Sequence, residues 1–412
     1  MSGTLQIAFF RSASLAFILL MLGLCLSACS LDKNCFDPDD PCPNNMIEDE
    51  YGCVWDHCAG EVFWGERIPC LAEDEHDNLA WWTLVGAHAQ YLAYVRDATA
   101  EDGTRGPLWL YDLETGEQRS ITESERRCTW VRASGNWVGC IEIGEYVGAY
   151  TRASDLLLVN VVSGVEWQIP NEERMQIASY SISGDRVVFV RRSEFYCASM
   201  NLPWDQVWVF DLTTGELSLI ADSVEESYRS TNAEIAGDVV AYWRVAGLCS
   251  GEYWSQLRMY NTASGVDSMF KEWSYHVYVD NNSLNDFAFD GQWVAMDEGS
   301  GIRAYAIDGS REIDVAYCPL ACDFNLSNGK VAYTQSGADG LNQLQVHVFD
   351  LETETDAQVT FGRPFWDGAS VQSLLGNRLL WGEGRGHNVW DDCGNFRPGS
   401  SQKLLFWKDI DF

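Results

Sequence analysis

The chain has 412 residues, of which 46% are hydrophobic and 13% aromatic, so it carries enough apolar surface for a packed core and is not a largely disordered chain. Acidic residues outnumber basic ones 61 to 27, giving a net charge of -34. A phosphate backbone would be repelled, which excludes nucleic acid as a partner. The charge favours a solvated, aggregation-resistant surface over a dedicated acidic site for cations or basic peptides.

The first 28 residues have the pattern of a signal peptide. Arg11 is their only charged residue, an apolar run follows from residue 15 to residue 26, and Ser27 and Ala28 are small. The run is shorter than the roughly 20 residues that a membrane-spanning helix needs. A permanent transmembrane helix is therefore the weaker interpretation, and we predict that residues 1–28 are removed.

The tetrapeptide Leu26-Ser27-Ala28-Cys29 directly follows the apolar run and resembles the lipobox of bacterial lipoproteins. The resemblance implies cleavage before Cys29 and attachment of a diacylglycerol and an N-acyl chain to it, which would anchor the chain stably to a membrane. Ordinary secretion with cleavage at a similar site is the alternative. By the same resemblance, Ser30 implies sorting to an outer membrane, so the expected location is the bacterial cell envelope.

The cysteine count fits an oxidising compartment. Of the 14 cysteines, Cys25 leaves with the signal peptide and Cys29 takes the lipid, so 12 remain, an even number where disulfides are permitted. Five of these crowd the N-terminal part: Cys35, Cys42, Cys53, Cys58 and Cys70. Their spacings do not resemble a zinc ribbon or a redox CxxC site, so structural disulfides are the default. We expect residues 29–62 to form a Cys-rich linker and residues 63–412 a folded domain.

A turn that contains Gly in six of seven copies, followed by a short apolar strand, recurs from residue 88 onward. The seven copies are HAQYLAYV (88–95), SGNWVGCI (134–141), SGDRVVFV (183–190), AGDVVAYW (236–243), DGQWVAMD (290–297), SNGKVAYT (327–334) and LGNRLLWG (375–382). The first apolar residues of these strands run from 92 to 379 over six intervals, a mean of about 48 residues. A repeat of this length indicates a propeller or a solenoid.

A second phrase alternates with the first, a strand that ends in a polar turn. Its copies are LWLYDLETGE (108–117), LLLVNVVSGV (156–165), VWVFDLTTGE (207–216), LRMYNTASGV (257–266), IRAYAIDGSR (302–311), VHVFDLETET (346–355) and the truncated LLFWKDIDF (404–412). We assign strand b to the first phrase and strand c to the second, with strand a before and strand d after them. Four short antiparallel strands make one propeller blade, so the sequence predicts an all-β, seven-bladed β-propeller. The repeated Asp suits a turn cap better than an active site.

These phrases resemble the repeats of TolB-type propellers, which also occur in the propeller domains of prolyl oligopeptidase and dipeptidyl peptidase relatives. The resemblance covers about residues 80–412 and implies a fold, not a function. No G-x-S-x-G elbow follows the repeats, so the peptidase activity of those relatives is not implied.

Ring closure needs a strand d for the last repeat, which ends at Phe412 where that strand should begin. Upstream, the stretch from Gly65 to Leu71 is similar to the d strands of other repeats. We predict that residues near 63–71 complete the seventh blade and leave no open edge. Pro69 is tolerable there because strand d is the outermost strand.

Long connections occur only at b–c and d–a, which share one face of the disk. The insertions 194–205, 247–254 and 384–400 lie there and carry the candidate binding-face residues Trp204, Tyr253, Trp254 and Trp390. Loops on a rigid scaffold are where binding usually resides. For any single aromatic, filling a gap between neighbouring loops is the default alternative.

The same strand assignment suggests disulfides. Cys128 and Cys140 flank a hairpin and are expected to face each other across strands a and b of blade two, with Cys140 replacing the aromatic of the strand. The remaining candidates are Cys197 with Cys249 in equivalent loops of adjacent blades, Cys318 with Cys322 around a small loop, and Cys393 with one of the N-terminal cysteines.

No catalytic residue and no metal site is predicted. The six His residues form no close ligand pair, and His347, in the middle of a strand, is expected to be a packed or surface residue. Asp37, Asp39 and Asp40 vaguely resemble a calcium loop, but a solvated linker is the better interpretation, so no cofactor is expected and calcium is only weakly suggested.

Two functions stay open. The first is a binding or assembly module that engages an envelope protein, a peptide or a small ligand. The second is a lyase or hydrolase that acts on a sugar or lactone over the central channel. Converging His, Arg and carboxylate side chains in a deep channel would favour the enzyme, and an aromatic channel mouth would favour the binding module.

Overall fold

The computed structural model describes residues 46–49, 52–55, 66–67, 78–86, 89–97, 106–147, 151–170, 175–193, 205–222, 228–229, 232–246, 253–275, 287–299, 301–317, 323–336, 344–360, 368–385, 388–390, 396–398 and 402–410. The chain divides into two compact units, Met1–Glu61 and Val62–Phe412. In the first unit, β1 (Met46–Asp49) and β2 (Gly52–Trp55) form an antiparallel hairpin. In the described part of the chain, no helix has the length and apolar character needed to cross a membrane.

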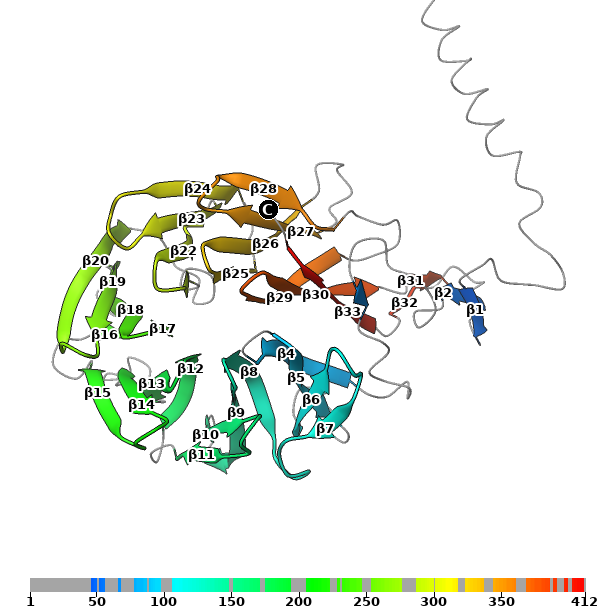
Figure 1. The fold of residues 1–412 in the computed structure, drawn as a ribbon, viewed down its shortest axis with the longest axis horizontal. Helices are drawn as coiled ribbons and strands as arrows, with labels where there is room; N and C mark the ends of the chain where they lie inside the picture. Colours follow the sequence, from blue (N-terminus) through cyan, green and yellow to red (C-terminus); the bar gives the residue numbers. More distant parts are fainter. Residues whose placement is uncertain are drawn as a thin grey trace, which may run out of the picture. The chain divides into compact units, whose positions relative to one another are not determined.

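The second unit is a ring of seven antiparallel sheets, and each sheet has the strand order a-b-c-d from the axis of the ring outward (Figure 1). The predicted all-β fold with seven four-stranded blades is confirmed. The innermost strands are β4 (Asn78–Val85), β8 (Cys128–Ser134), β12 (Met175–Ser183), β16 with β17 (Tyr228–Arg229 and Ala233–Ala236), β21 (Phe287–Phe289), β25 (Phe324–Ser327) and β29 (Gly368–Leu375).

The strands of the two repeated phrases form the middle of each blade, as expected from the sequence. The b strands are β5 (Tyr91–Asp97), β9 (Trp137–Val147), β13 (Arg186–Ser193), β18 (Val239–Ala246), β22 (Trp293–Asp297), β26 (Lys330–Ser336) and β30 (Arg378–Arg385). The c strands are β6 (Leu108–Asp112), β10 (Thr151–Asn160), β14 (Asp205–Asp211), β19 (Tyr253–Asn261), β23 (Gly301–Ala306), β27 (Leu344–Asp350) and β33 (Gln402–Asp409).

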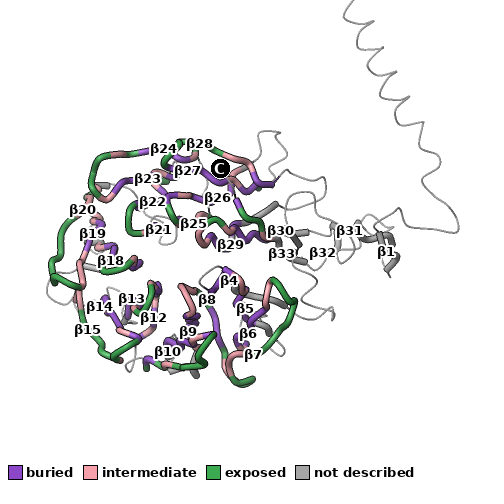
Figure 2. The backbone as a smooth tube through the Cα atoms, viewed as in Figure 1, coloured by how far each residue is buried: buried purple, intermediate pink, exposed green. Residues whose placement is uncertain are grey.

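In blades one to six the outermost strands are the most exposed part of the blade (Figure 2). They are β7 (Gln118–Ser120), β11 (Glu166–Ile169), β15 (Leu217–Asp222), β20 (Val266–Tyr275), β24 (Glu312–Tyr317), β28 (Thr355–Gln358) and β3 (Glu66–Arg67). A further hairpin, β31 (Asn388–Trp390) with β32 (Phe396–Pro398), lies between β30 and β33 in the chain.

The N-terminal strand β3 closes the ring. Glu66 pairs with Trp407 and Arg67 with Phe406, so β3 is the outer strand of the seventh blade beside β33. The prediction that residues near 63–71 supply this strand is confirmed. Pro69 lies outside the described residues.

The turns between c and d strands show why the repeats carry Asp before Thr-Gly. The Asp211 carboxylate accepts hydrogen bonds from the backbone N–H groups of Thr213, at 2.9 Å, and Thr214, at 2.8 Å. Gly215 then takes a positive φ of 74°, which favours glycine. The interpretation of the repeated Asp as a turn cap is confirmed.

The core consists of seven clusters of buried apolar side chains, one between each pair of neighbouring blades. The cluster at the seam between blades seven and one contains Leu84, Leu92 and Tyr94 from blade one and Leu380 from blade seven. Each blade therefore buries both of its faces against its neighbours, which is how a ring of thin sheets forms a packed core.

Candidate functional site at the inner edge of blades two to four

The aromatic residues expected on the loop-rich face are only partly covered by the structure. Tyr253 and Trp254 open β19, where they pair with β20, rather than lying in the preceding loop. Trp390 ends β31, so the insertion 384–400 contains a hairpin. The side chains of these three residues, and Trp204 as a whole, lie outside the described residues.

Most of the expected cysteine pairs also fall outside the described part of the chain. This applies to Cys29 and to Cys197, Cys249, Cys318, Cys322 and Cys393, so the lipid anchor and these disulfides stay predictions. His347 stacks on Tyr333 with ring centroids 5.4 Å apart, and its Nδ1 lies 2.9 Å from Asp356. It is a packed residue, as expected from its position in the strand.

The insertion of blade three begins and ends beside a pair of oppositely charged residues at the ends of two strands. Asp205, which is 0% exposed, lies 3.6 Å from the Nε of Arg192 across the ends of β13 and β14. The neighbouring Arg191 is also buried, donates to the carbonyl of Pro170 at 3.0 Å and lies over the ring of Trp208. Charges this deep must be paired, so the two ends of the loop are held in a fixed position.

Several innermost strands are bulged at a similar level. The register of the a–b pairs shifts at Ala80/Trp82 in blade one, Thr129/Arg132 in blade two, Ile177/Ser179 in blade three and Val371/Ser373 in blade seven. Blade four has its inner strand in two pieces, β16 and β17. Bulges redirect side chains out of a regular sheet and are frequent beside functional sites. The inner edge of this arc of blades therefore differs from that of blades five and six.

In blade two the irregular stretch contains Trp130 and Val131, which both lie opposite Cys140. The expected disulfide is present here, joining Cys128 to Cys140 across the a and b strands. Gly139 stands where most blades have Ala or a larger residue, and a Cβ on it would lie 2.7 Å from the ring of Tyr180. The missing Cβ of Gly139 thus makes room for an aromatic side chain from blade three.

Tyr180 fixes the backbone of the bulge. Its buried hydroxyl accepts a hydrogen bond from the N–H of Arg132 at 2.9 Å and lies 2.5 Å from the carbonyl oxygens of Trp130 and Gly139, to which it can donate. Burial raises the pKa of Tyr180 well above its ordinary value, so the hydroxyl keeps its proton. The bulge is consequently held by a neutral donor and acceptor from the neighbouring blade.

Trp130 is presented to solvent by this bulge. Its φ of 55° is in the left-handed region, where a bulky residue is uncommon. The residue is 46% exposed, whereas Thr129 and Val131 beside it are buried. The two faces of β8 pack against β4 and β12, so the exposed ring lies toward the free inner edge of the strand. A strained residue held this firmly is a candidate functional residue.

Arg132 continues the exposed surface along the inner edge. Its side chain is 48% exposed, and its Nη1 lies 2.9 Å from the carboxylate of Glu234, which is 9% exposed. Arg132 belongs to β8 and Glu234 to β17, two blades further on, so the guanidinium passes β12, which contacts both strands. No sequence pattern predicts this pair, whereas the unusual Gly139-Cys140 could have marked blade two as different.

A ladder of serine hydroxyls joins blade three to blade four behind this pair. Ser183 Oγ accepts from the N–H of Gly237 at 3.0 Å, and Ser181 Oγ accepts from the N–H of Ile235 at 3.5 Å. Ser179 faces the same interface, since it pairs with Val190 of the core between these blades. Its buried hydroxyl has no hydrogen-bond partner in the described part of the chain. A buried polar group without a partner is costly and indicates a place where a ligand or water can bind.

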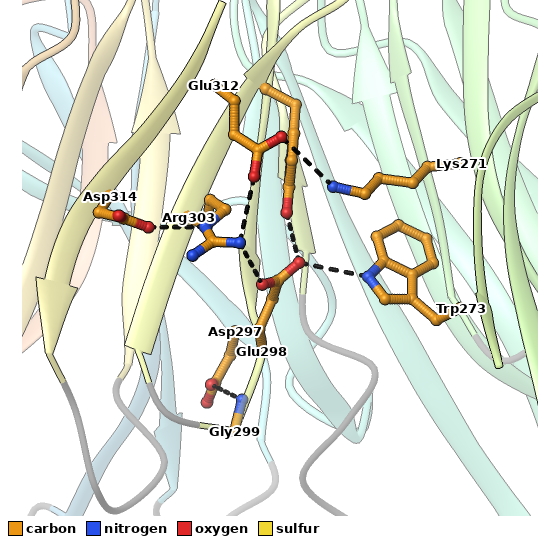
Figure 3. Close-up of polar contacts among 9 residues, drawn as sticks. Lys271, Trp273, Asp297, Glu298, Gly299, Arg303, Glu312 and Asp314 are labelled. Carbon is orange, nitrogen blue, oxygen red and sulfur yellow. Dashed lines mark hydrogen bonds and ion pairs between the residues drawn. The ribbon is translucent and has the colours of Figure 1, made fainter. Parts of the chain in front are cut away.

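A second polar cluster lies between blades four and five (Figure 3). Glu298 is at its centre and accepts hydrogen bonds from the hydroxyl of Tyr305 and from the indole N–H of Trp273, at 3.2 Å. Arg303 lies 3.2 Å from the same carboxylate. Lys271 of β20 packs over the ring of Tyr305, with its Nζ 3.4 Å from the ring centroid.

The remaining carboxylates of this cluster neutralise the same two cations. Arg303 lies 3.1 Å from Glu312 and 2.6 Å from Asp314, and Glu312 is 3.8 Å from Lys271. Burial lowers the pKa of Lys271, and the nearby Glu312 opposes that shift. Because each carboxylate already has a cationic partner, the cluster acts as a clamp between blades four and five rather than as a binding site.

Among the described residues, no group of three or more His, Cys, Asp or Glu side chains could hold a metal ion. No family model matches the chain. No curated protein matches it either.

Solved structures share the fold. An oligogalacturonate lyase in complex with manganese superposes with a TM-score of 0.51 at 14% identity, covering 84% of this chain and 92% of the lyase. The β-propeller domain of the Trilobed protease from Pyrococcus furiosus, described as having an open velcro topology, has a TM-score of 0.52 at 12% identity, covering 79% of this chain and 97% of that domain.

Dipeptidyl peptidase 4 from Porphyromonas gingivalis has a TM-score of 0.49 at 10% identity, covering 73% of this chain. This chain spans 50% of that peptidase. At such identities the comparisons show a β-propeller and no more. The TolB-type resemblance and the lipid anchor stay predictions.

Proposed function

We propose that this protein is a lipid-anchored β-propeller of the bacterial cell envelope that works as a binding module. The observation that carries the binding role is the rigid display of Trp130 and Arg132 at the inner edge of blade two. Tyr180 and the Cys128–Cys140 disulfide hold the bulge that presents them. Pre-organised aromatic and Arg side chains are typical of binding hot spots, because little conformational freedom is lost when a partner docks.

The extracytoplasmic location is supported by sequence and structure together. Disulfides persist in oxidising compartments and are rare in the cytosol, and both Cys128 and Cys140 are fully buried in the core between blades one and two. The signal peptide pattern and the lipobox-like Cys29 fit the same compartment. We propose the outer membrane as the site of anchoring, on the basis of Ser30.

The partner is an envelope protein, a peptide or a small ligand. The net charge of -34 disfavours nucleic acid and strongly anionic surfaces. The loop-rich face with Trp204, Tyr253, Trp254 and Trp390 remains part of the proposed binding surface.

Two measurements test this function. Mass spectrometry of the N-terminal peptide from the full chain expressed in a bacterium should show a diacylated and N-acylated Cys29, and Cys29→Ser should release the protein from membranes. Affinity purification from solubilised envelopes should then recover a partner or ligand with the wild-type chain. The same ligand should be lost with Trp130→Asn and kept with Tyr317→Ala, an exposed aromatic on blade five. Equal recovery with all three chains would refute the binding role of the inner edge.

The alternative of a lyase or hydrolase has only the shared fold in its favour. The oligogalacturonate lyase is similar over most of both chains, but at 14% identity. The described residues at the inner edge offer one Arg, one paired carboxylate and a serine, and no observation assigns them a reaction. We therefore propose a binding module rather than a lyase or hydrolase.

A further inference from the structure

We propose that the inner edge of blades two to four binds an uncharged saccharide. Trp130 supplies the surface on which a sugar ring stacks. Arg132 and Glu234 supply hydrogen bonds to its hydroxyl groups. This inference rests on the proposed function, since it names the ligand class of the same site.

The stacking surface is the clearest element. A sugar ring has an apolar C–H face that gains contact area on a flat aromatic ring, and Trp offers the largest such ring. Trp130 is 46% exposed on the innermost strand, and its backbone is fixed by Tyr180 at both Trp130 and Arg132. The ring is therefore presented without a large loss of side-chain or backbone entropy on binding.

The polar groups beside it suit hydroxyls rather than ions. The guanidinium of Arg132 only donates hydrogen bonds, and the carboxylate of Glu234 only accepts them. The two charges lie 2.9 Å apart and neutralise each other. A sugar hydroxyl, which donates and accepts at once, can bridge such a pair, whereas a charged ligand would meet one group of its own sign.

Ser179 lies behind this pair, in the interface between blades three and four. Its oxygen is buried and without a hydrogen-bond partner among the described residues, although Ser181 and Ser183 on the same strand are both used. The N–H of Ala233, which would continue the ladder, is taken by the side chain of Asn232 at 2.9 Å. The oxygen has almost no accessible surface, so it is not counted among the groups that the saccharide contacts.

An extended peptide is less well matched. Peptides that add to a sheet use a row of free backbone N–H and C=O groups along a strand edge. Here the N–H groups of Ile235 and Gly237 are already taken by serines of blade three, and the bulge interrupts the edge of β8. The overall charge of -34 opposes acidic saccharides, which leaves uncharged ones.

The test is calorimetric titration of the full, detergent-solubilised protein with four uncharged tetrasaccharides, built of glucose, galactose, mannose or N-acetylglucosamine. We expect at least one to bind. Trp130→Asn should weaken that binding about tenfold or more, because it removes the ring while Asn tolerates a positive φ. Arg132→Gln should weaken it as well, and the matched variant Tyr317→Ala, which changes an aromatic that is 69% exposed at the end of β24, should bind as the wild type does.

Melting temperatures of all three variants establish that each is folded. The inference is overturned if none of the four tetrasaccharides binds, or if binding is unchanged in Trp130→Asn. A tetramer of galacturonic acid binding more tightly than the uncharged ones would also overturn it. If an envelope protein or peptide is recovered in a Trp130-dependent way while no saccharide binds, the proposed binding function stands and only the saccharide is wrong.

Discussion

Tyr180 shows how a side chain of one blade can fix the backbone of the neighbouring blade. In blades one, four and six the tyrosine of the b strand reaches its own d strand, as Tyr333 does when it donates to Asp356 at 2.9 Å. Blade two has Cys140 at that position, which faces blade one and is bonded to Cys128, while Gly139 beside it leaves room on the opposite face for Tyr180 from the inner strand of blade three. Blade two therefore has an inner strand whose bulge is held by a side chain of blade three.

Tyr180→Phe should therefore cost more than the loss of one ordinary hydrogen bond. The N–H of Arg132 and the carbonyl of Trp130 would lose a buried partner, which costs about 1–3 kcal/mol in the free energy of unfolding. Urea denaturation checks this. The matched variant Tyr333→Phe removes one hydrogen-bond donor from Asp356, which is partly exposed and keeps its contact with His347, so we expect a smaller loss, about 0.5–1.5 kcal/mol. Equal losses in the two variants would contradict the role of Tyr180 in holding the bulge of blade two.

Glu354 is a second residue that departs from the repeat. It occupies the c–d turn position that glycine takes in five other blades, and its φ is 54°. Its carboxylate lies 2.8 Å from Arg311 of blade five, but both side chains are exposed, so this pair contributes little. We expect Glu354→Gly to stabilise the protein by about 0.5–1 kcal/mol, because backbone strain is relieved.

The reverse change serves as its control. Gly116 has a φ of 74° in the equivalent turn of blade one, with open space around it apart from the hydroxyl of Tyr111 at 3.6 Å. Gly116→Glu should destabilise the protein by about 1–2 kcal/mol. If the two substitutions shift the urea midpoint in the same direction, strain at this turn position is not the cause.

The strands follow a common plan, and their outer edges are protected in two ways. Blades one, two, six and seven have d strands of only two to four residues. The longer d strands of blades three, four and five carry a bulge opposite their c strands, at Ile220, Phe270 and Val315. Short strands and bulges both hinder pairing with another chain. The outer strands of the ring are therefore protected from edge-to-edge association.

The b strands, c strands and turns of the ring could be predicted from the sequence because each is set by local pattern: an apolar alternation and a turn with Gly or Asp. The bulges could not, since CTWVRAS of β8 reads as an ordinary strand. Their cause is tertiary, namely the room left by Gly139 and the ring of Tyr180. The pairing of Arg132 with Glu234 joins residues 102 positions apart, which no local pattern reveals.

The Asp-capped turns predict a dependence of stability on pH. Hydrogen bonds from the backbone N–H groups of Thr214 and Thr213 lower the pKa of Asp211 below its ordinary value. A lowered pKa in the folded state means that the stabilisation is present above the unfolded-state pKa of about 3.9 and is lost as the pH falls through the folded-state value. Asn160 and Asn261 cap the equivalent turns of blades two and four without a charge.

Asp211→Asn should thus keep the turn and remove its titration. We expect urea unfolding at pH 7 to change by less than about 0.5 kcal/mol, because Asn accepts the same hydrogen bonds. Between pH 5 and pH 2 the variant should lose stability less steeply than the wild type. An unchanged slope in that range would show that Asp211 does not contribute to acid sensitivity.

At the scale of the whole ring, the seam between blades seven and one decides whether the propeller is a closed unit. Three kinds of contact either cross this seam or complete the seventh blade beside it. The strand β3 pairs with β33, the hydroxyl of Ser373 accepts from the N–H of Leu84 at 3.3 Å, and Arg378 donates to the carbonyl of Ala89 at 3.2 Å. The apolar cluster around Leu380 fills the space between them.

Leu380→Ala tests this closure. Leu380 is fully buried among Leu84, Leu92 and Tyr94, and a closed, rigid seam cannot collapse around the missing atoms, so we expect a loss of about 2–5 kcal/mol in the free energy of unfolding. Val188→Ala, at the equivalent position of blade three, removes fewer atoms from an ordinary interface and should cost less. If Leu380→Ala costs less than Val188→Ala, water or neighbouring side chains fill the space freely, and the ring is open at this seam.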